Sequence, residues 1–150
     1  MSGIKLTTKL DAQKSVSLGN LRIAKAIYNF GVDGGSHTVA SGLLTPKKGV
    51  TLPKNAVIVG GTLNCPTAGV SGGSATITLG TSAGSSASAL LGATAGAVAN
   101  LSTNALINLV PTIAVPVKLT TKGDITMTIG TADLTAGIFE ICVYYYVAAS

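Results

Sequence analysis

Few residues in this chain could support catalysis, and His37 is its single histidine. Asp33 and Ser36 lie close to it, and serine, histidine and aspartate together can form a nucleophilic triad. All three fall within one glycine-rich turn, which is a poor setting for the geometry that a triad needs. We therefore interpret His37 as a surface or strand-edge histidine and predict no catalytic residues.

A metal site is not expected either, because one histidine and the widely separated Cys65 and Cys142 do not match a zinc-binding spacing. Both cysteines lie in apolar, strand-like runs, so we expect buried, reduced thiols, with a disulfide left open. Asp124 and Asp133 flank a predicted strand, and for them we expect turn capping. The sequence predicts no metal ion and no cofactor.

Two glycine-rich stretches, residues 69–73 and 80–84, resemble phosphate loops only in composition. Neither is followed by Lys-Ser or Lys-Thr, and neither opens a long predicted helix, as a phosphate loop requires. With no nucleophile, metal site or phosphate loop, the prediction is a protein that is not an enzyme and has no small-molecule substrate.

The composition is most unusual between Lys54 and Lys118, where residues 55–117 contain no Asp, Glu, Lys or Arg. A soluble protein surface normally carries about a quarter of its residues as charges. Gly, Ser, Thr, Asn and Pro interrupt the stretch every few residues, so it does not read as a membrane-spanning helix. We interpret it as buried, partly in a β-rich core and partly against other protein chains, as in a subunit of an assembly.

Positive charge is concentrated at the start of the chain. Residues 1–54 hold eight basic residues against two acidic ones, whereas residues 55–150 hold two against three. Residues 1–22 are polar and weakly periodic, so we predict a basic N-terminal arm there and a single domain over 23–150. The arm contributes four candidate docking residues: Lys5, Lys9, Lys14 and Arg22. A contact with an acidic protein surface and a merely solubilising end both remain open, whereas nucleic acid is disfavoured because no aromatic residue interleaves the lysines.

Period-two alternation and β-branched runs predict strands along most of the domain. Residues 56–64 form the strongest buried strand, and the Gly60-Gly61 pair inside it indicates a bulge. The other strands are expected at residues 26–32, 37–41, 75–79, 112–117, 125–129 and 138–147. Residues 45–54 and 66–73 are expected to be loops, and residues 88–93 the one helical turn.

About eight short strands with a short helical turn predict an all-β fold. We expect a β-sandwich of jelly-roll-like topology, because an immunoglobulin-like domain would place a Trp against a cysteine pair and this chain has no Trp. Residues 75–81 and 125–131 share an alternation of threonine and aliphatic residues that ends in Gly-Thr. Such matched strands are expected to occupy related places in two packed sheets.

The last predicted strand carries Tyr144, Tyr145 and Tyr146. Alternation places Tyr144 and Tyr146 on one face of the strand and Tyr145 on the other. Two interpretations stay open, a central strand with hydroxyls at its rim and a subunit interface, where an apolar ring with a polar tip is favourable.

Several segments of the chain resemble small structural proteins encoded among tailed-bacteriophage head genes. The segments that carry the resemblance are residues 24–35, 52–61, 72–81, 90–95 and 134–139. The resemblance implies a β-sandwich, jelly-roll-like subunit of the virion, of the capsid decoration or cement type and often trimeric. It provides no site motif, so no functional residue is carried over.

These features together predict a phage capsid decoration protein, or cement protein, that binds the outer surface of the major capsid shell and stabilises it. The expected partners are further copies of this chain, as a homotrimer, and the major capsid protein, with no nucleic acid and no membrane. Residues 1–5 open a polar sequence without an apolar signal core, so we expect synthesis in the host cytoplasm and a final place on the virion surface.

Two other functions are kept as alternatives. One is a head-fibre or tail-fibre subunit, in which similar β-domains trimerise. The other is a small carbohydrate- or host-binding module, which would need exposed aromatic residues and carboxylates in its loops. Residues 66–74 and 80–87 contain neither.

Overall fold

The computed structural model describes residues 20–83, 87–110 and 117–149. In the described part the elements follow one another along the chain as β1 (Arg22–Asn29), α2 (Phe30–Asp33), the 3-10 helix η1 (Val39–Gly42), β2 (Leu43–Leu44), β3 (Lys48–Gly49), β4 (Ala56–Ser71), β5 (Thr76–Thr81), the 3-10 helix η2 (Val98–Asn100), β6 (Ala105–Leu109), β7 (Val117–Lys118), β8 (Ile125–Gly130) and β9 (Leu134–Val147).

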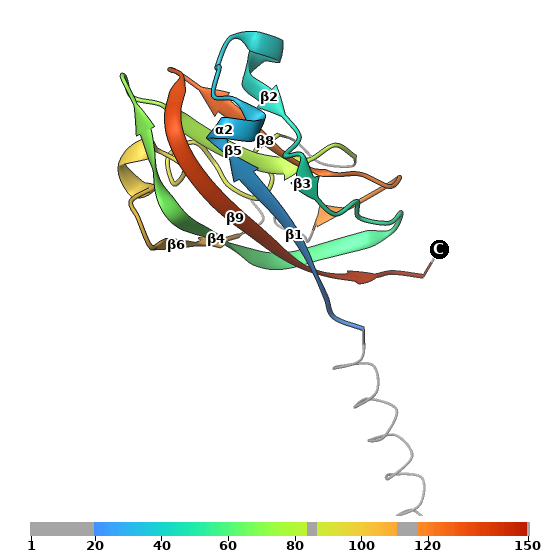
Figure 1. The fold of residues 1–150 in the computed structure, drawn as a ribbon. Coiled ribbons are helices and arrows are strands. Elements are labelled where there is room, and N and C mark those ends of the chain that lie inside the picture. The colour runs from blue at the N-terminus through green and yellow to red at the C-terminus, as the bar shows by residue number, and fades with distance from the viewer. Residues whose placement is uncertain (1–19, 84–86, 111–116, 150) are drawn as a thin grey trace, which may run out of the picture.

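These strands form two antiparallel sheets packed face to face (Figure 1). The larger sheet has the order β3-β1-β9-β4-β6, with β7 also pairing with β4, and the smaller sheet has the order β2-β8-β5. The predicted all-β sandwich is confirmed.

The core lies between the sheets and is built from residues that alternate along the strands. On β1 the buried side chains are Ala24, Ala26 and Tyr28, and on β9 they include Phe139. The Tyr28 and Phe139 rings stack with centroids 5.2 Å apart. The charge-free stretch supplies much of this core, so its burial within the domain is observed. The core residues from that stretch are Ala56, Ile58, Leu63, Cys65, Ala75, Ile77, Leu79, Ala89, Leu90, Leu91, Leu101, Leu109 and Val117.

Strands β4 and β9 are the long central pair, and the predicted bulge lies where it was expected. The register of β4 on β9 shifts between Ile58 and Gly60. At Gly61 the two backbones approach so closely that an added Cβ would lie 2.1 Å from the carbonyl oxygen of Cys142. Only glycine fits at position 61, which explains why this residue interrupts an otherwise β-branched strand.

The first predicted strand was drawn too long, because β1 ends at Asn29 and residues 30–33 form α2. The Asn29 side chain accepts a hydrogen bond from the Gly31 N–H at 2.9 Å and caps the turn. The Asp33 carboxylate accepts from the Asn29 N–H at 2.9 Å and holds the turn closed. These local side-chain bonds outweigh the alternation of residues 26–32.

The predicted strand over residues 37–41 is also wrong. Residues 39–42 form η1, within which Ala40 and Ser41 both have positive φ, 51° and 57°. Backbone in this left-handed region cannot continue a strand. The predicted helical turn at residues 88–93 lies instead in non-helical turns, where the N–H groups of Leu90 and Leu91 both bond to the Leu79 carbonyl.

Strand β4 continues through the predicted loop of residues 66–73 as far as Ser71. Its partner β9 is long enough to pair with it throughout, and register shifts after Asn64 take up the irregularity around Pro66. Strand β6 was not predicted. Of the predicted strand at 112–117 only Val117 belongs to the described residues, and it begins β7.

The two matched segments lie side by side in one sheet rather than in two. Strands β5 and β8 pair along their whole length, with Ile77 opposite Ile129 and Thr78 opposite Thr128. Because both strands alternate threonine with aliphatic residues, the paired residues place their aliphatic side chains on the inward face of the sheet and their threonines on the outward face.

Candidate interaction surface

The large sheet has a face that points away from the core, and we call it the outward face. Its exposed or half-buried residues from the strands are Ile23, Lys25, Ile27, Thr62, Asn64, Leu106, Asn108, Lys118, Glu140, Cys142, Tyr144 and Tyr146. These exposures leave the face open to solvent in the described structure. Near its middle the Lys25 ammonium lies 3.3 Å from a Glu140 carboxylate oxygen.

One end of the outward face carries a group of apolar side chains, which we call the apolar patch: Ile23, Val57, Tyr144 and Tyr146. Ile23 lies opposite Tyr144 in the pairing of β1 with β9, and Val57 lies opposite Tyr146 in the pairing of β4 with β9. Ile23 is 63% exposed and Tyr146 39% exposed, whereas Tyr144 is half-buried and Val57 is 7% exposed. Exposed apolar groups gathered in this way mark interfaces more often than scattered ones.

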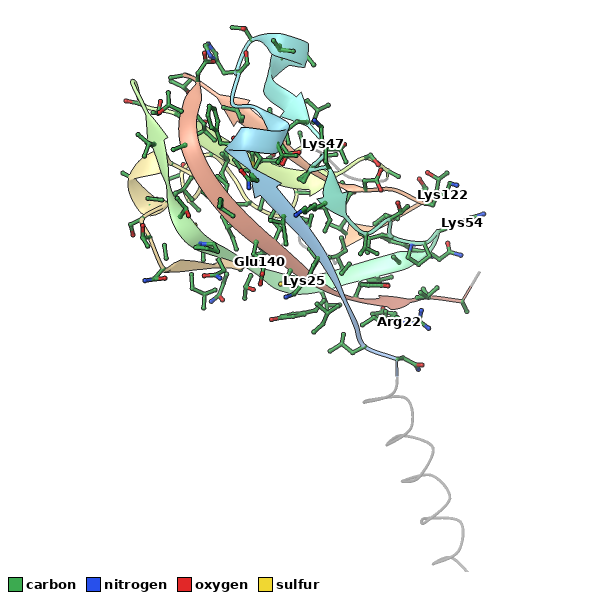
Figure 2. All side chains as sticks on the ribbon, viewed as in Figure 1. Arg22, Lys25, Lys47, Lys54, Lys122 and Glu140 are labelled. Carbon is green, nitrogen blue, oxygen red and sulfur yellow. The ribbon has the colours of Figure 1, made fainter. Side chains whose placement is uncertain are left out.

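Four basic residues surround the same end of the sandwich, and we call this group the basic end: Arg22, Lys54, Lys118 and Lys122. Lys118 lies opposite Val57 on β4. Lys54 precedes Asn55, whose N–H donates to the Leu119 carbonyl at 3.0 Å. Figure 2 shows Lys54 and Lys122 on the same side of the molecule, with Arg22 near the start of β1.

Backbone hydrogen bonds hold this basic end together. Leu52 and Gly123 exchange two N–H···O=C bonds of 2.7 and 3.0 Å, which places Lys122 next to the segment that carries Lys54. Leu52 is fully buried, so the predicted exposed loop of residues 45–54 is anchored at this point, and β3 adds a second anchor. Lys54 and Lys118 precede and follow the charge-free stretch in the sequence. They lie at the same end of the domain because the segment after the stretch pairs with the segment where it begins.

The charges at the basic end are not neutralised within the described part of the chain. Arg22, Lys54, Lys118 and Lys122 are exposed, and none of them forms an ion pair with another described residue. The acidic side chains are engaged elsewhere. Asp124, the nearest in sequence, accepts the Thr51 hydroxyl at 2.7 Å.

The predicted docking and interface residues fall into three groups. Lys5, Lys9 and Lys14 lie outside the described residues. Arg22 is exposed as the first residue of β1, so the strand begins one residue inside the predicted arm. The alternation of the tyrosines is as predicted: Tyr144 and Tyr146 point outward, whereas Tyr145 is 7% exposed and packs in the core.

Sequence reasoning missed the convergence of Lys54, Lys118 and Lys122. The available signal was that Lys54 and Lys118 lie at the two ends of the charge-free stretch, next to segments that were predicted to be strands and could therefore pair. Strand pairing between distant segments is a non-local property, so the spacing of these lysines did not reveal it.

The groups that could have done chemistry have structural roles instead. His37 pairs with Asp133 rather than with Asp33 or Ser36, since its Nδ1 lies 2.5 Å from the Asp133 carboxylate. The His37 N–H also donates to that carboxylate at 2.8 Å, and this backbone bond, with the side-chain bond, lowers the pKa of Asp133. Asp124 and Asp133 therefore lie at opposite ends of β8 with separate partners.

The two cysteines are free thiols on opposite faces of the large sheet. Cys65 points into the core, and burial raises its pKa. Cys142 is half-buried on the outward face, where burial is again the main cause that raises its pKa. Residues on opposite faces cannot bring their sulfur atoms together, so no disulfide joins them.

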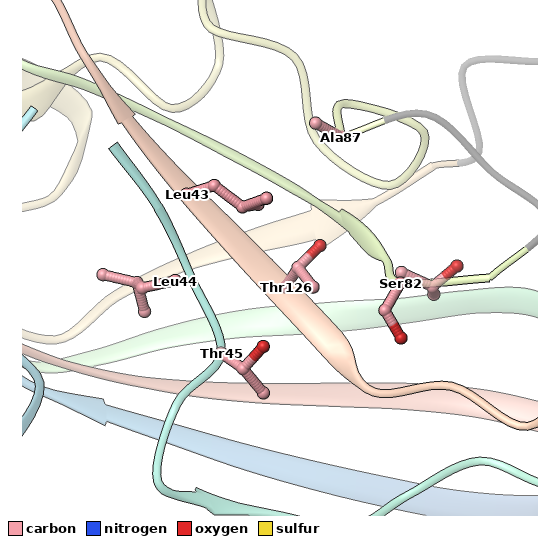
Figure 3. Close-up of a pocket in the computed structure, with 7 residues that line it drawn as sticks. Leu43, Leu44, Thr45, Ser82, Ala87 and Thr126 are labelled. Atoms are coloured by element: carbon pink, nitrogen blue, oxygen red, sulfur yellow. The ribbon is translucent and has the colours of Figure 1, made fainter. Parts of the chain in front are cut away.

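A cavity of about 450 Å³ opens beside β2 and β8 (Figure 3). It is lined by Leu43, Leu44, Thr45, Thr81, Ser82, Ala87 and Thr126. Hydroxyl and methyl groups provide neither a nucleophile with an adjacent base nor a stacking surface. Among the described residues no group of three or more metal-ligating side chains is found, and no helix is long and apolar enough to cross a membrane.

The fold is similar to chains of solved phage capsid structures. A chain of the cyanophage Pam1 capsid asymmetric unit is 22% identical, with 86% of each chain covered and a TM-score of 0.58. A chain of the acidic stable capsid of Helicobacter pylori bacteriophage KHP30 is 15% identical, with 87% of this chain and 90% of that chain covered and a TM-score of 0.56.

A chain of the Ralstonia phage GP4 capsid is likewise 15% identical, with 88% of this chain and 87% of that chain covered and a TM-score of 0.59. No family model matches this chain, and no curated protein sequence matches it. The covered shares of each pair are nearly equal, so the similar chains are about as long as this one. At these identities the likeness is one of fold.

Proposed function

We propose that this protein is a small structural component of a phage capsid, and that it acts as a decoration or cement protein on the outer surface of the shell. The observation that carries the proposal is a β-sandwich with an open outward face whose fold matches, over most of its length, similarly sized chains from capsid structures of three phages. An open face that carries an apolar patch is what a subunit of an assembly needs and what a monomer would have to leave exposed.

The self-association that we propose uses the two edges of the large sheet. At one edge β6 exposes Leu106, which is 66% exposed, followed by Val110, which is 67% exposed. At the other, Ile23 of β1 and the preceding Leu21 are exposed, beyond the two residues of β1 that pair with β3. A contact between unlike edges is heterologous, and such contacts close into rings when the rotation allows. This supports the homotrimer as the proposed state.

The N-terminal arm is proposed to dock onto the shell. It carries Lys5, Lys9 and Lys14, and it joins the domain at Arg22, beside the basic end. A segment that orders on binding gains contact area and electrostatic steering and loses conformational entropy, so its contribution should depend on salt.

The carbohydrate-binding alternative has less support. Among the described residues that line the cavity beside β2 there is no aromatic ring on which a sugar could stack and no carboxylate to bind its hydroxyls. The fibre alternative shares the trimer and differs in its attachment, so a binding experiment separates it from decoration.

The test is to mix the purified protein with capsid shells that were assembled without it, and to measure co-sedimentation and shell melting. Saturable binding and a higher melting temperature of the shells are expected. A protein that neither binds the shells nor changes their melting would refute the decoration role, and one found only at a single vertex or on the tail would favour a fibre.

The oligomeric state is measured separately, by analytical ultracentrifugation of the full chain and of Leu106→Glu. The variant places a charge on the exposed β6 edge without touching the core. A trimer that dissociates in the variant supports the edge contact, whereas a wild-type monomer at tens of micromolar, both free and on shells, contradicts it.

A further inference from the structure

We propose that the basic end and the apolar patch together form one docking surface of the folded domain, and that this surface binds an acidic face of a protein. In the proposed decoration role this is the surface that meets the shell, so the inference deepens that role. It adds Lys54, Lys118 and Lys122 to the docking element and makes the folded domain, not the arm alone, responsible for attachment.

Charge is the first argument. Strand pairing and backbone bonds bring Lys54, Lys118 and Lys122 to one end of the domain, with Arg22 near that end at the start of β1 (Figure 2), and none of the four has an ion-pair partner among the described residues. Unpaired like charges held close together repel one another, and an acidic partner relieves that repulsion.

The arrangement of polar and apolar groups is the second argument. Lys118 lies opposite Val57, and Val57 lies opposite Tyr146, so the three side chains form one row across β7, β4 and β9. Ile23 and Tyr144 form the next pair on the same face. Protein interfaces commonly have such an apolar, tyrosine-bearing centre within a charged rim.

The same chemistry favours a protein over a nucleic acid as the partner. Single-stranded nucleic acids bind on successive aromatic rings along a basic groove. Here the most exposed side chain of the apolar centre is the aliphatic Ile23, and Arg22 is the single arginine at the rim. Aliphatic side chains gain nothing from stacking on bases but gain from burial against another protein.

The test compares two charge reversals in the full chain, Lys118→Glu and Lys48→Glu. Both lysines are exposed, neither forms an ion pair with a described residue, and both variants change the net charge equally. Only Lys118 lies at the basic end, whereas Lys48 lies on β3. Binding to capsid shells is expected to weaken about tenfold for K118E and less than twofold for K48E, because an attraction at an exposed site is replaced by a repulsion of similar size.

A second pair tests the apolar centre. Tyr146→Ser removes the most exposed ring of the patch, and Val39→Ser removes an apolar side chain that is 71% exposed on η1, outside the patch. Y146S is expected to bind shells several-fold more weakly, while V39S binds like the wild type. Equal binding within either matched pair would overturn the inference.

A probe that does not depend on the shell keeps the two proposals distinguishable. Immobilised poly-L-glutamate should release K118E at lower salt than K48E, and a single-stranded DNA oligonucleotide should compete poorly. If the wild type fails to bind shells but shows this order on poly-L-glutamate, the decoration role fails and the docking surface stands. Identical release of the two variants, or stronger binding to DNA than to poly-L-glutamate, overturns the docking surface whatever the shells do.

Discussion

Gly60 and Gly61 are neighbours in β4 that permit a sharply matched pair of substitutions. Neither has positive φ, so alanine is compatible with both backbones. An alanine Cβ at position 60 would lie 3.9 Å from the Leu109 carbonyl oxygen and from Tyr144 Cδ2, which is ordinary contact. At position 61 it would lie 2.1 Å from the Cys142 carbonyl oxygen and 3.1 Å from Val143 Cα, so β4 and β9 would have to separate.

The expected free energies of unfolding follow from these distances. Gly60→Ala should stabilise the protein by about 0.5 kcal/mol, because it reduces the freedom of the unfolded chain and adds no clash. Gly61→Ala should destabilise it by about 3 kcal/mol or more, since the clash is with backbone that cannot rotate away. At about 3 °C per kcal/mol for a chain of this size, the two melting temperatures should differ by roughly 10 °C.

The measurement is thermal and urea unfolding followed by circular dichroism, at one protein concentration because association would add stability. A free energy of unfolding for G61A within about 0.5 kcal/mol of that for G60A would refute the reasoning. It would mean that the central pair of the large sheet relaxes at little cost and that the close approach does not determine the glycine.

Three further predictions concern titratable groups. Burial, with the nearby Asp33 charge, raises the pKa of Tyr28 to about 12, above its ordinary 10.0. An unfolded tyrosine therefore loses its proton first. The contribution of Tyr28 to stability should be constant below about pH 10 and be lost towards pH 12, and Tyr28→Phe should lack that loss. The same variant loses the hydrogen bond that the Tyr28 hydroxyl donates to the Gly34 carbonyl at 2.7 Å, at a cost of about 1 kcal/mol at neutral pH; unchanged unfolding curves would contradict both effects. The His37 backbone and side-chain bonds lower the pKa of Asp133. Their contribution to the stability of the fold is therefore present above the ordinary aspartate pKa and is lost as the pH falls. Asp133→Asn should therefore show a smaller loss of melting temperature between pH 7 and pH 3 than the wild type, and an equal loss would exclude this role. Iodoacetamide should label Cys142 but not the fully buried Cys65 in the folded protein, and both after denaturation; mass spectrometry that found Cys65 labelled first, or a disulfide, would contradict the assignment of the two faces.

The sequence was most informative where local pattern and tertiary structure agree. Residues 56–64 and 138–147 are strands because β-branched and aromatic residues suit a pleated, buried surface, and both belong to the central pair. Alternation was sufficient to place Tyr144 and Tyr146 on one face of the strand and Tyr145 on the other, and the structure shows that Tyr145 is the buried one. The class of fold follows from such segments alone.

The sequence was least informative where side-chain hydrogen bonds or a strand distant in the sequence determine the local secondary structure. Asn29 and Asp33 turn a good strand pattern into α2, and their bonds cannot be read from alternation. Pro66 reads as a strand end, yet β4 continues because β9 lies beside it. Of the proposed docking surface, Arg22 and the tyrosines were named from the sequence, whereas Lys54 and Lys118 are brought to one end of the domain by the pairing of β4 with β7 and by the bond from the Asn55 N–H to the Leu119 carbonyl.

The matched strands β5 and β8 have a consequence for how the protein folds. Both repeat threonine and aliphatic residues, so sliding one strand past the other by two residues would keep every side chain on its proper face. The segments that flank the small sheet restrict such a shift. A Cβ on Gly42 would lie 1.9 Å from the Ile129 carbonyl oxygen, and one on Gly96 would lie 1.9 Å from that of Ile77, so each flanking segment lies tightly against its own strand. Ile77 and Ile129 face each other, so the two flanking segments contact the same residue pair from opposite sides. A shift of β5 along β8 would therefore also move these two segments relative to each other, and the alignment of the small sheet depends on its connections as well as on its strands.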